Sequence, residues 1–231
     1  MRHVENEAIL ILDFGGQYAQ LIARRVRDCH VFCEIKSYKT SVEEIINKGY
    51  KGIILTGGSN SVWEESSPKC DPALLEAGIP VLGIAYGAQA ITYALGGSVA
   101  TAEVKEYGSA SVEFDLTSSL FTGTEKNSVA WMSHMDQIKE IPMGFRVTAH
   151  TANCPVAAME NLEKNLYAVQ FHPEVEHSTY GNQMLKNYLY HICECKGDWM
   201  MSTFVETCLL YTSFPQSGPK LLLQNKQHRN Q

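Results

Sequence analysis

The chain has 231 residues, of which 45% are hydrophobic and 19% charged, as in an ordinary soluble globular protein that can bury a substantial core. The formal net charge of −6, without any basic run, argues against nucleic acid or an anionic membrane as a partner. The apolar run near the N-terminus is too short for a secretory signal or a membrane span.

Short apolar segments alternate with helical patterns through the first hundred residues. The segments that predict strands are 9–12, 31–35, 52–58 and 79–84. The segments that predict helices are 17–28, a short helix that begins at residue 42, 72–77 and 86–95. Capping signals at Ser41 and Asp71 mark the starts of the two short helices. Because continuously apolar strands alternate with helices, we expect a mostly parallel sheet covered on both faces.

The pattern changes after the first hundred residues. Val112, Phe114 and Leu116 alternate with Glu113 and Asp115, which is typical of a half-exposed antiparallel strand. Three further strands are predicted at 145–149, 155–159 and 166–171. An amphipathic helix is predicted at 184–192. We therefore expect one α/β domain over residues 1–197, with a more antiparallel second half.

The end of the chain differs in composition. Residues 208–231 are rich in Pro, Ser, Gln, Asn and Lys, and a segment of this kind buries too little apolar surface to fold. Its beginning, CLLYTS, also matches one reading frame of a transposon end used in sequencing libraries. We therefore expect a disordered or non-native tail.

The seven cysteines are scattered and odd in number, which predicts reduced thiols in a cytoplasmic protein rather than a disulfide framework. Cys193 and Cys195 form a C-x-C pair. No C-x-x-C accompanies this pair, so buried thiols are a better interpretation than a metal site. We expect no metal in this chain.

The turn between the strand at 79–84 and the helix at 86–95 resembles one that presents a nucleophile. Gly83 and Gly87 flank Ala85 at two residues on each side, as the glycines flank the serine in G-x-S-x-G. A thiol at such a helix N-terminus would have a lowered pKa. Ala85 has no reactive atom, however, and the glycine spacing alone fits an ordinary βα turn better.

Paired glycines end the strand that begins at residue 52. In Thr56-Gly57-Gly58, the missing side chains would let backbone N–H groups approach a ligand closely. Such a loop can serve as an oxyanion hole, with the N–H of Tyr86 as second donor, or it can be a simple turn. A phosphate loop is excluded, since no Gly-Lys-Ser/Thr follows.

The segment VQFHPEVEH at 169–177 places an imidazole and a carboxylate at the end of an apolar strand. His172 and Glu174 are two residues apart, so both can point to one side. The carboxylate would then orient the imidazole, as in a nucleophile–base–orienter relay. An ordinary surface pair is the alternative. Zinc is a poorer interpretation, because the spacing of His172 and His177 does not match H-E-x-x-H.

Taken together, these segments resemble one family. The motifs that carry the resemblance are, in chain order, LDFGGQYAQLIARRVRD, GIILTGGSNSV, GIAYGAQ, EYG, WMSHMD, CPVAAM, AVQFHPEVEH and GDW. They are similar to the class I glutamine amidotransferase (glutaminase) domain of GMP synthases over roughly residues 8–207. The resemblance implies a flavodoxin-like, doubly wound sheet. It also implies an enzyme that releases ammonia from glutamine for the amination of XMP to GMP.

The resemblance assigns the catalytic positions. Ala85 occupies the place of the nucleophile, which is cysteine in the family. His172 matches the general base and acid, and Glu174 matches the residue that orients it. The backbone N–H groups of Gly58 and Tyr86 match the oxyanion hole.

The positions that hold the glutamine substrate in the family correspond to Gln89, Ser133 and His134. A methyl group at residue 85 cannot form a thioester, and losing a nucleophile lowers the rate by on the order of a million-fold. We therefore expect the chain to bind L-glutamine without hydrolysing it. An engineered change, a natural pseudoglutaminase and a sequence error would each account for the alanine. Ser59 is a smaller departure, because the family usually has proline there.

The resemblance ends before the second half of a GMP synthase. The SGGxDS loop of the ATP pyrophosphatase (synthetase) domain is absent. ATP and Mg²⁺ are therefore expected only in that missing domain, normally on the same chain, and no cofactor is expected here. Residues 198–207 resemble the start of the linker toward it. Two other functions stay open: a catalytically dead module that binds glutamine or regulates a partner, and a plain flavodoxin-like binding protein.

Overall fold

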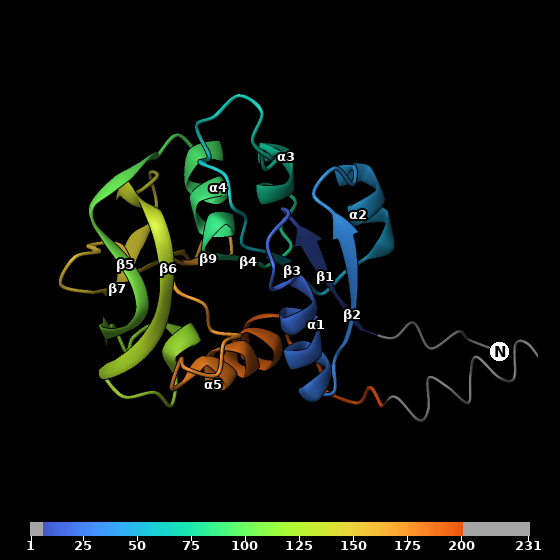
Figure 1. The fold of residues 1–231 in the computed structure, drawn as a ribbon. Helices are drawn as coiled ribbons and strands as arrows, with labels where there is room; N and C mark the ends of the chain where they lie inside the picture. The colour runs from blue at the N-terminus through green and yellow to red at the C-terminus, as the bar shows by residue number, and fades with distance from the viewer. Residues whose placement is uncertain (1–6, 201–231) are drawn as a thin grey trace, which may run out of the picture. The chain divides into compact units, whose positions relative to one another are not determined.

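A mixed sheet of nine strands runs through residues 7–200, the part of the chain that the computed structural model describes (Figure 1). The strands are β1 (Ala8–Asp13), β2 (Phe32–Ser37), β3 (Gly52–Leu55), β4 (Val81–Ile84), β5 (Ser98–Phe114), β6 (Asn127–Glu140), β7 (Arg146–His150), β8 (Ala158–Asn161) and β9 (Leu166–Val169). Their order across the sheet is β2-β1-β3-β4-β9-β8-β7-β5-β6. The described residues up to Trp199 belong to a single compact unit.

The sheet is parallel in its first half and antiparallel in its second. Strands β2, β1, β3, β4 and β9 pair in parallel, in the order that flavodoxin-like folds share. From β9 through β8, β7 and β5 to β6 the pairs are antiparallel. The predicted α/β fold with a more antiparallel second half is confirmed.

Helices cover both faces of the sheet. Their bounds are α1 (Ala19–Asp28), α2 (Val42–Lys48), α3 (Pro72–Leu75), α4 (Tyr86–Ala94) and α5 (Gly181–Lys186), with a 3₁₀ turn at Ser119–Phe121 and a π-helix at Asn187–Ile192. Figure 1 shows α1 and α5 on one face and α2, α3 and α4 on the other. Successive side chains of β1 point to opposite faces. Ile9 and Ile11 therefore join the core under α1 and α5, whereas Leu10 and Leu12 join the core under the other three helices.

The two short helices begin where the sequence places capping groups. The Ser41 hydroxyl accepts a hydrogen bond from the backbone N–H of Glu44 (3.3 Å) at the start of α2. Asp71 accepts one from the N–H of Ala73 (2.9 Å), just before Pro72 of α3. These bonds satisfy N–H groups that the first helical turn leaves without an acceptor. Both predicted helix starts are confirmed.

The hairpin of β5 and β6 is much longer than the single strand predicted at 112–116. β5 has 17 residues and β6 has 14, and much of β5 exposes its side chains, including Val104 and Tyr107. A strand segment that buries neither face has no apolar alternation, and the prediction depended on that signal. Apart from a bulge at residues 102–105, backbone pairing between the two strands holds this part of the hairpin.

Two predicted elements are displaced along the chain. The strand expected at 155–159 is β8, which begins three residues later. The residues between β7 and β8 form a turn, in which the Thr151 N–H donates a hydrogen bond to the Cys154 carbonyl (2.9 Å). The helix expected at 184–192 begins earlier, with α5, and ends as the π-helix.

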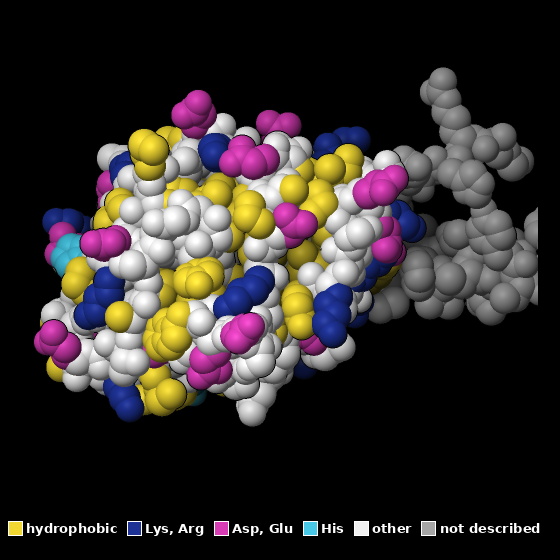
Figure 2. Space-filling model, turned by 90° about the horizontal axis from the view of Figure 1, so that it is seen from above, with side chains coloured by type: hydrophobic (Ala, Val, Ile, Leu, Met, Phe, Trp, Pro, Cys, Tyr) yellow, Lys and Arg dark blue, Asp and Glu magenta, His cyan; other side chains and the backbone are white. Residues whose placement is uncertain are grey.

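The predicted linker at 198–207 lies outside the described residues from position 201 onward, as does the whole predicted tail at 208–231. Within residues 7–200, no helix is long and apolar enough to cross a membrane. On the face that Figure 2 shows, acidic and basic side chains are interspersed among small hydrophobic groups. That face therefore carries no basic patch of the kind that binds nucleic acid.

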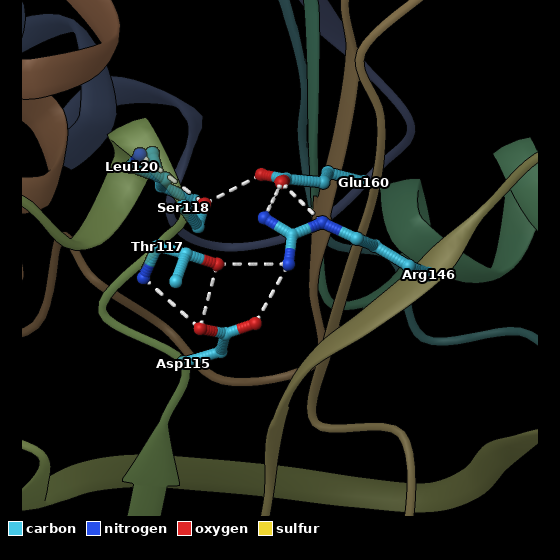
Figure 3. A network of polar contacts seen from close by, with 6 residues as sticks. All are labelled: Asp115, Thr117, Ser118, Leu120, Arg146 and Glu160. Atoms are coloured by element: carbon cyan, nitrogen blue, oxygen red, sulfur yellow. Dashed lines mark hydrogen bonds and ion pairs between the residues drawn. The ribbon is translucent and has the colours of Figure 1, made fainter.

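A polar network joins β7 and β8 in the antiparallel half of the sheet (Figure 3). Arg146 lies opposite Glu160 in the strand register and donates from Nε to the Glu160 carboxylate (2.9 Å). Ser118 donates to the other carboxylate oxygen, and Arg146 also contacts Asp115 (2.7 Å) and Thr117 (2.9 Å). Glu160 is only 1% exposed, so its charge depends on these partners.

Replacing Arg146 with alanine is expected to lower the free energy of unfolding by about 2–4 kcal/mol, because Glu160 is then buried without its cation. The matched control is Lys164→Ala, which breaks an ion pair with Glu76 in which both side chains are well exposed. That loss should stay within about 1 kcal/mol. Urea denaturation followed by circular dichroism measures both values, and equal losses would contradict the role assigned to the network.

Candidate active site

A pocket of about 440 Å³ opens at the carboxyl ends of β1, β3 and β4, beside the start of α4. Open α/β sheets place their ligands at this edge. Seven of the eight residues predicted for the site line it: Gly58, Ala85, Tyr86, Gln89, Ser133, His134 and His172. The eighth, Glu174, contacts His172. The structure therefore brings the whole predicted set together.

Ala85 lies at a sharply bent junction between β4 and α4. Its φ of 52° and ψ of −107° are rare for a residue with a side chain, and such strain costs on the order of 1–3 kcal/mol. A Cβ on Gly83 would lie 2.6 Å from the Gly87 carbonyl oxygen, and one on Gly87 would lie 2.4 Å from that of Leu55. Both glycines are thus required for the turn, as in a nucleophile elbow.

The first turn of α4 follows Ala85 directly. The Ala85 carbonyl accepts the N–H groups of Ala88 (3.0 Å) and Gln89 (3.2 Å), and the N–H of Tyr86 precedes the helical hydrogen-bond ladder. Helix N-termini stabilise negative charge. A negative charge that develops on a ligand beside Ala85 would therefore be stabilised.

His172 and Glu174 form a buried pair at the same edge of the sheet. Nδ1 of His172 lies 2.8 Å from Oε1 of Glu174, and the two residues are 5% and 1% exposed. The N–H of His172 donates to the Trp131 carbonyl (2.9 Å), and the Ser178 hydroxyl donates to the His172 carbonyl (2.6 Å). Since Nδ1 is engaged, Nε2 is the ring nitrogen left for acid–base chemistry.

Glycine backbone borders the space between Ala85 and His172. A methyl group on Gly57 would lie 3.5 Å from Cε1 of His172 and 3.9 Å from Cβ of Ala85. A Cβ on Gly16 would lie 2.4 Å from the Gly57 carbonyl oxygen, so the loop after β1 packs directly against the loop after β3. For a plain flavodoxin-like binding protein we would expect His172, Glu174 and the Gly57-Gly58 loop to lie far from Ala85. They meet at one pocket instead, which argues against that interpretation.

The three residues predicted to hold the substrate line the pocket from α4 and β6: Gln89, Ser133 and His134. The Gln89 amide donates to the Asp136 carbonyl (2.9 Å) and to the side-chain oxygen of Gln170 (3.4 Å), so its orientation is fixed. Burial lowers the pKa of His134, which favours the neutral imidazole.

The sequence profile of class-I glutamine amidotransferases matches residues 10–192 of this chain, a range that includes every residue of the pocket. The chain belongs to the class-I glutamine amidotransferase family.

Curated relatives of this amidotransferase carry the description GMP synthase [glutamine-hydrolyzing]. The protein from Ruminiclostridium cellulolyticum is 55% identical over 206 residues, which cover 89% of this chain and 40% of that protein. The protein from Clostridium botulinum (strain Alaska E43) is 54% identical over 203 residues, with 88% and 40% covered. The chain thus spans about two fifths of the length of the curated relatives it matches.

Solved structures show the same amidotransferase fold. A protein from Thermoplasma acidophilum, described as a candidate subunit of GMP synthase, superposes with a TM-score of 0.72 at 28% identity, covering 90% of this chain and 100% of that chain. A glutamine amidotransferase from Thermotoga maritima superposes with a TM-score of 0.66 at 16% identity, covering 82% and 99%. The second likeness concerns the fold alone.

The amidotransferase pocket contains no thiol among the described residues, since none of its lining residues is a cysteine. The six cysteines that the structure describes are free and buried elsewhere. Ala85 contributes only a methyl group at the tip of the elbow. The orienting pair and the glycine loops are present around it.

Several residues that line the amidotransferase pocket are not among those predicted from the sequence: Gly16, Tyr18, Tyr107, Met135, Asp136 and Gln170. The Asp136 carboxylate accepts hydrogen bonds from Ser61 (2.6 Å) and Thr101 (3.1 Å) and so connects three segments. The rings of Tyr18 and His172 pack in a T-shaped arrangement, with 5.1 Å between the ring centres. The motifs DFGGQY, EYG and WMSHMD contain most of these residues, but a motif does not show which of its members face a cavity.

Proposed function

We propose that this chain is the glutaminase part of a GMP synthase and that its pocket binds L-glutamine. One observation carries the proposal: the elbow at Ala85, the backbone of Gly57 and Gly58, and the His172–Glu174 pair meet at one pocket. The 55% identity to a GMP synthase described as glutamine-hydrolyzing supports this substrate.

With a thiolate at residue 85, the reaction would proceed through a thioester. The thiolate attacks the side-chain carbonyl carbon of glutamine, and the N–H groups of Gly58 and Tyr86 stabilise the negative charge on the oxygen. His172, oriented by Glu174, gives a proton to the departing ammonia. It then takes a proton from the water that hydrolyses the thioester to glutamate.

Ala85 stops this sequence before the first bond forms. A methyl group cannot attack the amide, so we propose that the chain holds glutamine with its amide intact. The alanine also favours a second candidate function, a catalytically dead module that binds glutamine or regulates a partner. The two functions differ in whether the rest of the pocket still supports covalent chemistry once residue 85 carries a thiol.

The ammonia acceptor is proposed to be an ATP pyrophosphatase (synthetase) domain that aminates XMP to GMP. The coverage of only 40% of the GMP synthase relatives supports an acceptor beyond this chain. ATP and Mg²⁺ would be bound there, and the chemistry proposed for this chain uses no cofactor. We place it in the cytoplasm, where reduced thiols are the rule, because all six described cysteines are free.

Isothermal titration calorimetry of the chain with L-glutamine is expected to show one saturable site. The glutamine should not be converted to glutamate. Gln89→Ala should weaken binding by about tenfold or more, equivalent to about 1.4 kcal/mol, because it removes a fixed polar group from the pocket wall. The matched control is Gln183→Ala. Gln183 lies on α5 and outside the pocket, so this variant should bind glutamine with unchanged affinity.

L-Asparagine, which is one methylene shorter, should bind about tenfold or more weakly than glutamine. A folded chain without saturable glutamine binding would refute the assignment of the pocket. Equal affinities of the parent and the Gln89→Ala variant would place any binding elsewhere on the chain.

A further inference from the structure

Three potential metal-ligating side chains from distant parts of the sequence meet beside the pocket. Glu106 comes from β5, His134 from β6, and Cys154 from the turn between β7 and β8. One donor atom from each lies within 4.8 Å of the other two. The side chains of Glu106 and His134 are only 9% and 2% exposed, and Cys154 is fully buried. Within residues 7–200, no other group of three such side chains is as close.

Several donor atoms of this cluster make no hydrogen bond within residues 7–200. Oε2 of Glu106 and both ring nitrogens of His134 are buried without a hydrogen-bond partner among the described residues. Nε2 of His134 lies 3.9 Å from Oε2 of Glu106, which is too long for a hydrogen bond. Buried polar atoms in folded proteins are almost always paired, so this arrangement calls for a ligand.

A bulge in the β5–β6 hairpin places Glu106 opposite His134. Thr101 pairs with Asp136 and Glu106 pairs with His134, so four residues of β5 lie opposite the single residue between those partners on β6. Bulges of this kind re-aim side chains and are frequent near functional sites. Here the irregular register gives the cluster a carboxylate and an imidazole on directly opposed strands.

A single hydroxyl orients two members of the cluster. The Thr151 side chain donates to Oε1 of Glu106 (2.8 Å) and accepts from the backbone N–H of Cys154 (2.8 Å). The Asn153 amide also approaches Oε1 of Glu106 (3.5 Å). The other carboxylate oxygen, Oε2, is left free for a ligand. Supporting contacts of this type hold metal-ligating groups in place.

The donor set selects among cations. Ca²⁺ and Mg²⁺ prefer oxygen ligands alone, whereas a thiolate, an imidazole and a carboxylate together suit Zn²⁺. The lowered pKa of His134, which burial causes, favours the neutral imidazole that binds metals. Burial raises the pKa of Cys154 to about 12, so the thiol is protonated until a cation displaces its proton.

We propose that Glu106, His134 and Cys154 bind one Zn²⁺ ion, with a fourth position open to water. On binding, the S–H bond of Cys154 breaks, its proton goes to solvent, and a Zn–S bond forms, so affinity rises with pH. The donor atoms need to approach one another by about 1 Å to reach zinc–ligand geometry. The ion takes no part in the covalent steps proposed for glutamine, which use His172, Glu174 and the N–H groups of Gly58 and Tyr86, although His134 also lines the glutamine pocket.

The test is a titration of the reduced, metal-free full-length chain with Co²⁺ as a spectroscopic probe for zinc. We expect one Co²⁺ to bind per chain and to give a thiolate-to-cobalt charge-transfer band in the near ultraviolet. Addition of Zn²⁺ should abolish that band. Cys154→Ser should abolish the band, and His134→Gln should weaken binding by about tenfold or more. The matched control Cys193→Ser removes another buried thiol and should keep the band.

The proposal is overturned if no saturable band forms, if the band persists in Cys154→Ser, or if it disappears in Cys193→Ser. A buried water bridging Glu106 and His134 would then satisfy the unpaired atoms. Circular dichroism shows whether each variant is folded. Should Cys154→Ser not fold, zinc X-ray absorption of the parent chain decides the question. One sulfur with two or three nitrogen or oxygen neighbours supports the site, and a shell without sulfur or with two sulfurs rejects it.

Discussion

Replacing Ala85 with cysteine is expected to let the chain form a covalent adduct with an electrophilic glutamine analogue, a reaction that the parent chain lacks. The elbow fixes residue 85 at the start of α4, where the helix N-terminus favours a thiolate. The pocket provides space for the added sulfur, since Ala85 forms part of its wall. Intact mass spectrometry should show one adduct, and free L-glutamine should suppress it.

The native cysteines that the structure describes are poor competitors for the analogue. Burial raises the pKa of Cys33 and Cys195 to about 11 and that of Cys70 and Cys154 to about 12. A thiol introduced by Tyr93→Cys, on the exposed side of α4, is the matched control. It should react with the electrophile, but glutamine should give it no protection.

Restoring the thiol should also restore glutamine hydrolysis from an undetectable level, since removal of a nucleophile costs on the order of a million-fold in rate. A folded Ala85→Cys chain without a glutamine-protected adduct would show that more than one atom is missing from the pocket. The interpretation as a binding or partner-regulating module would then be preferred. A protected adduct would show that the rest of the glutaminase pocket is intact.

The parallel half of the fold and the elbow could be predicted because their signals are local. The apolar run of β1 is buried on both faces, so its sequence and its environment agree. Gly83 and Gly87 are separated by the spacing that the turn itself requires, and a Cβ at either position would collide with backbone. Local steric requirements of this kind can be predicted from a single sequence.

The zinc-ligand cluster and the exposed hairpin could not be predicted, because they depend on strand register. Glu106 lies opposite His134 only because of the bulge in β5. Cys154 lies near them only because of the turn after β7. The long exposed part of β5 likewise lacks apolar alternation. Tertiary pairing decides these features, and neither periodicity nor motif spacing reports it.

Removing the His172 imidazole from the Ala85→Cys chain is expected to slow the covalent reaction by about 10²–10⁴-fold. A neighbouring imidazole lowers the pKa of a thiol by stabilising the thiolate. Without it, the rate of adduct formation should rise only at higher pH. The matched control is His177→Ala, which removes an exposed imidazole five residues away and should leave the rate and its pH profile unchanged.

Glu174 acts through His172, so its loss has a different signature. Glu174→Gln keeps the size of the side chain but removes the charge that lies 2.8 Å from Nδ1, and the amide can present its NH₂ to that nitrogen and stabilise the wrong tautomer. Adduct formation should slow while glutamine still protects the thiol, because the binding wall is untouched. The exposed neighbour variant Glu176→Gln should match the Ala85→Cys parent. If Glu174→Gln reacted at the parent rate, the buried pair would be a structural contact and His172 would need no orienter.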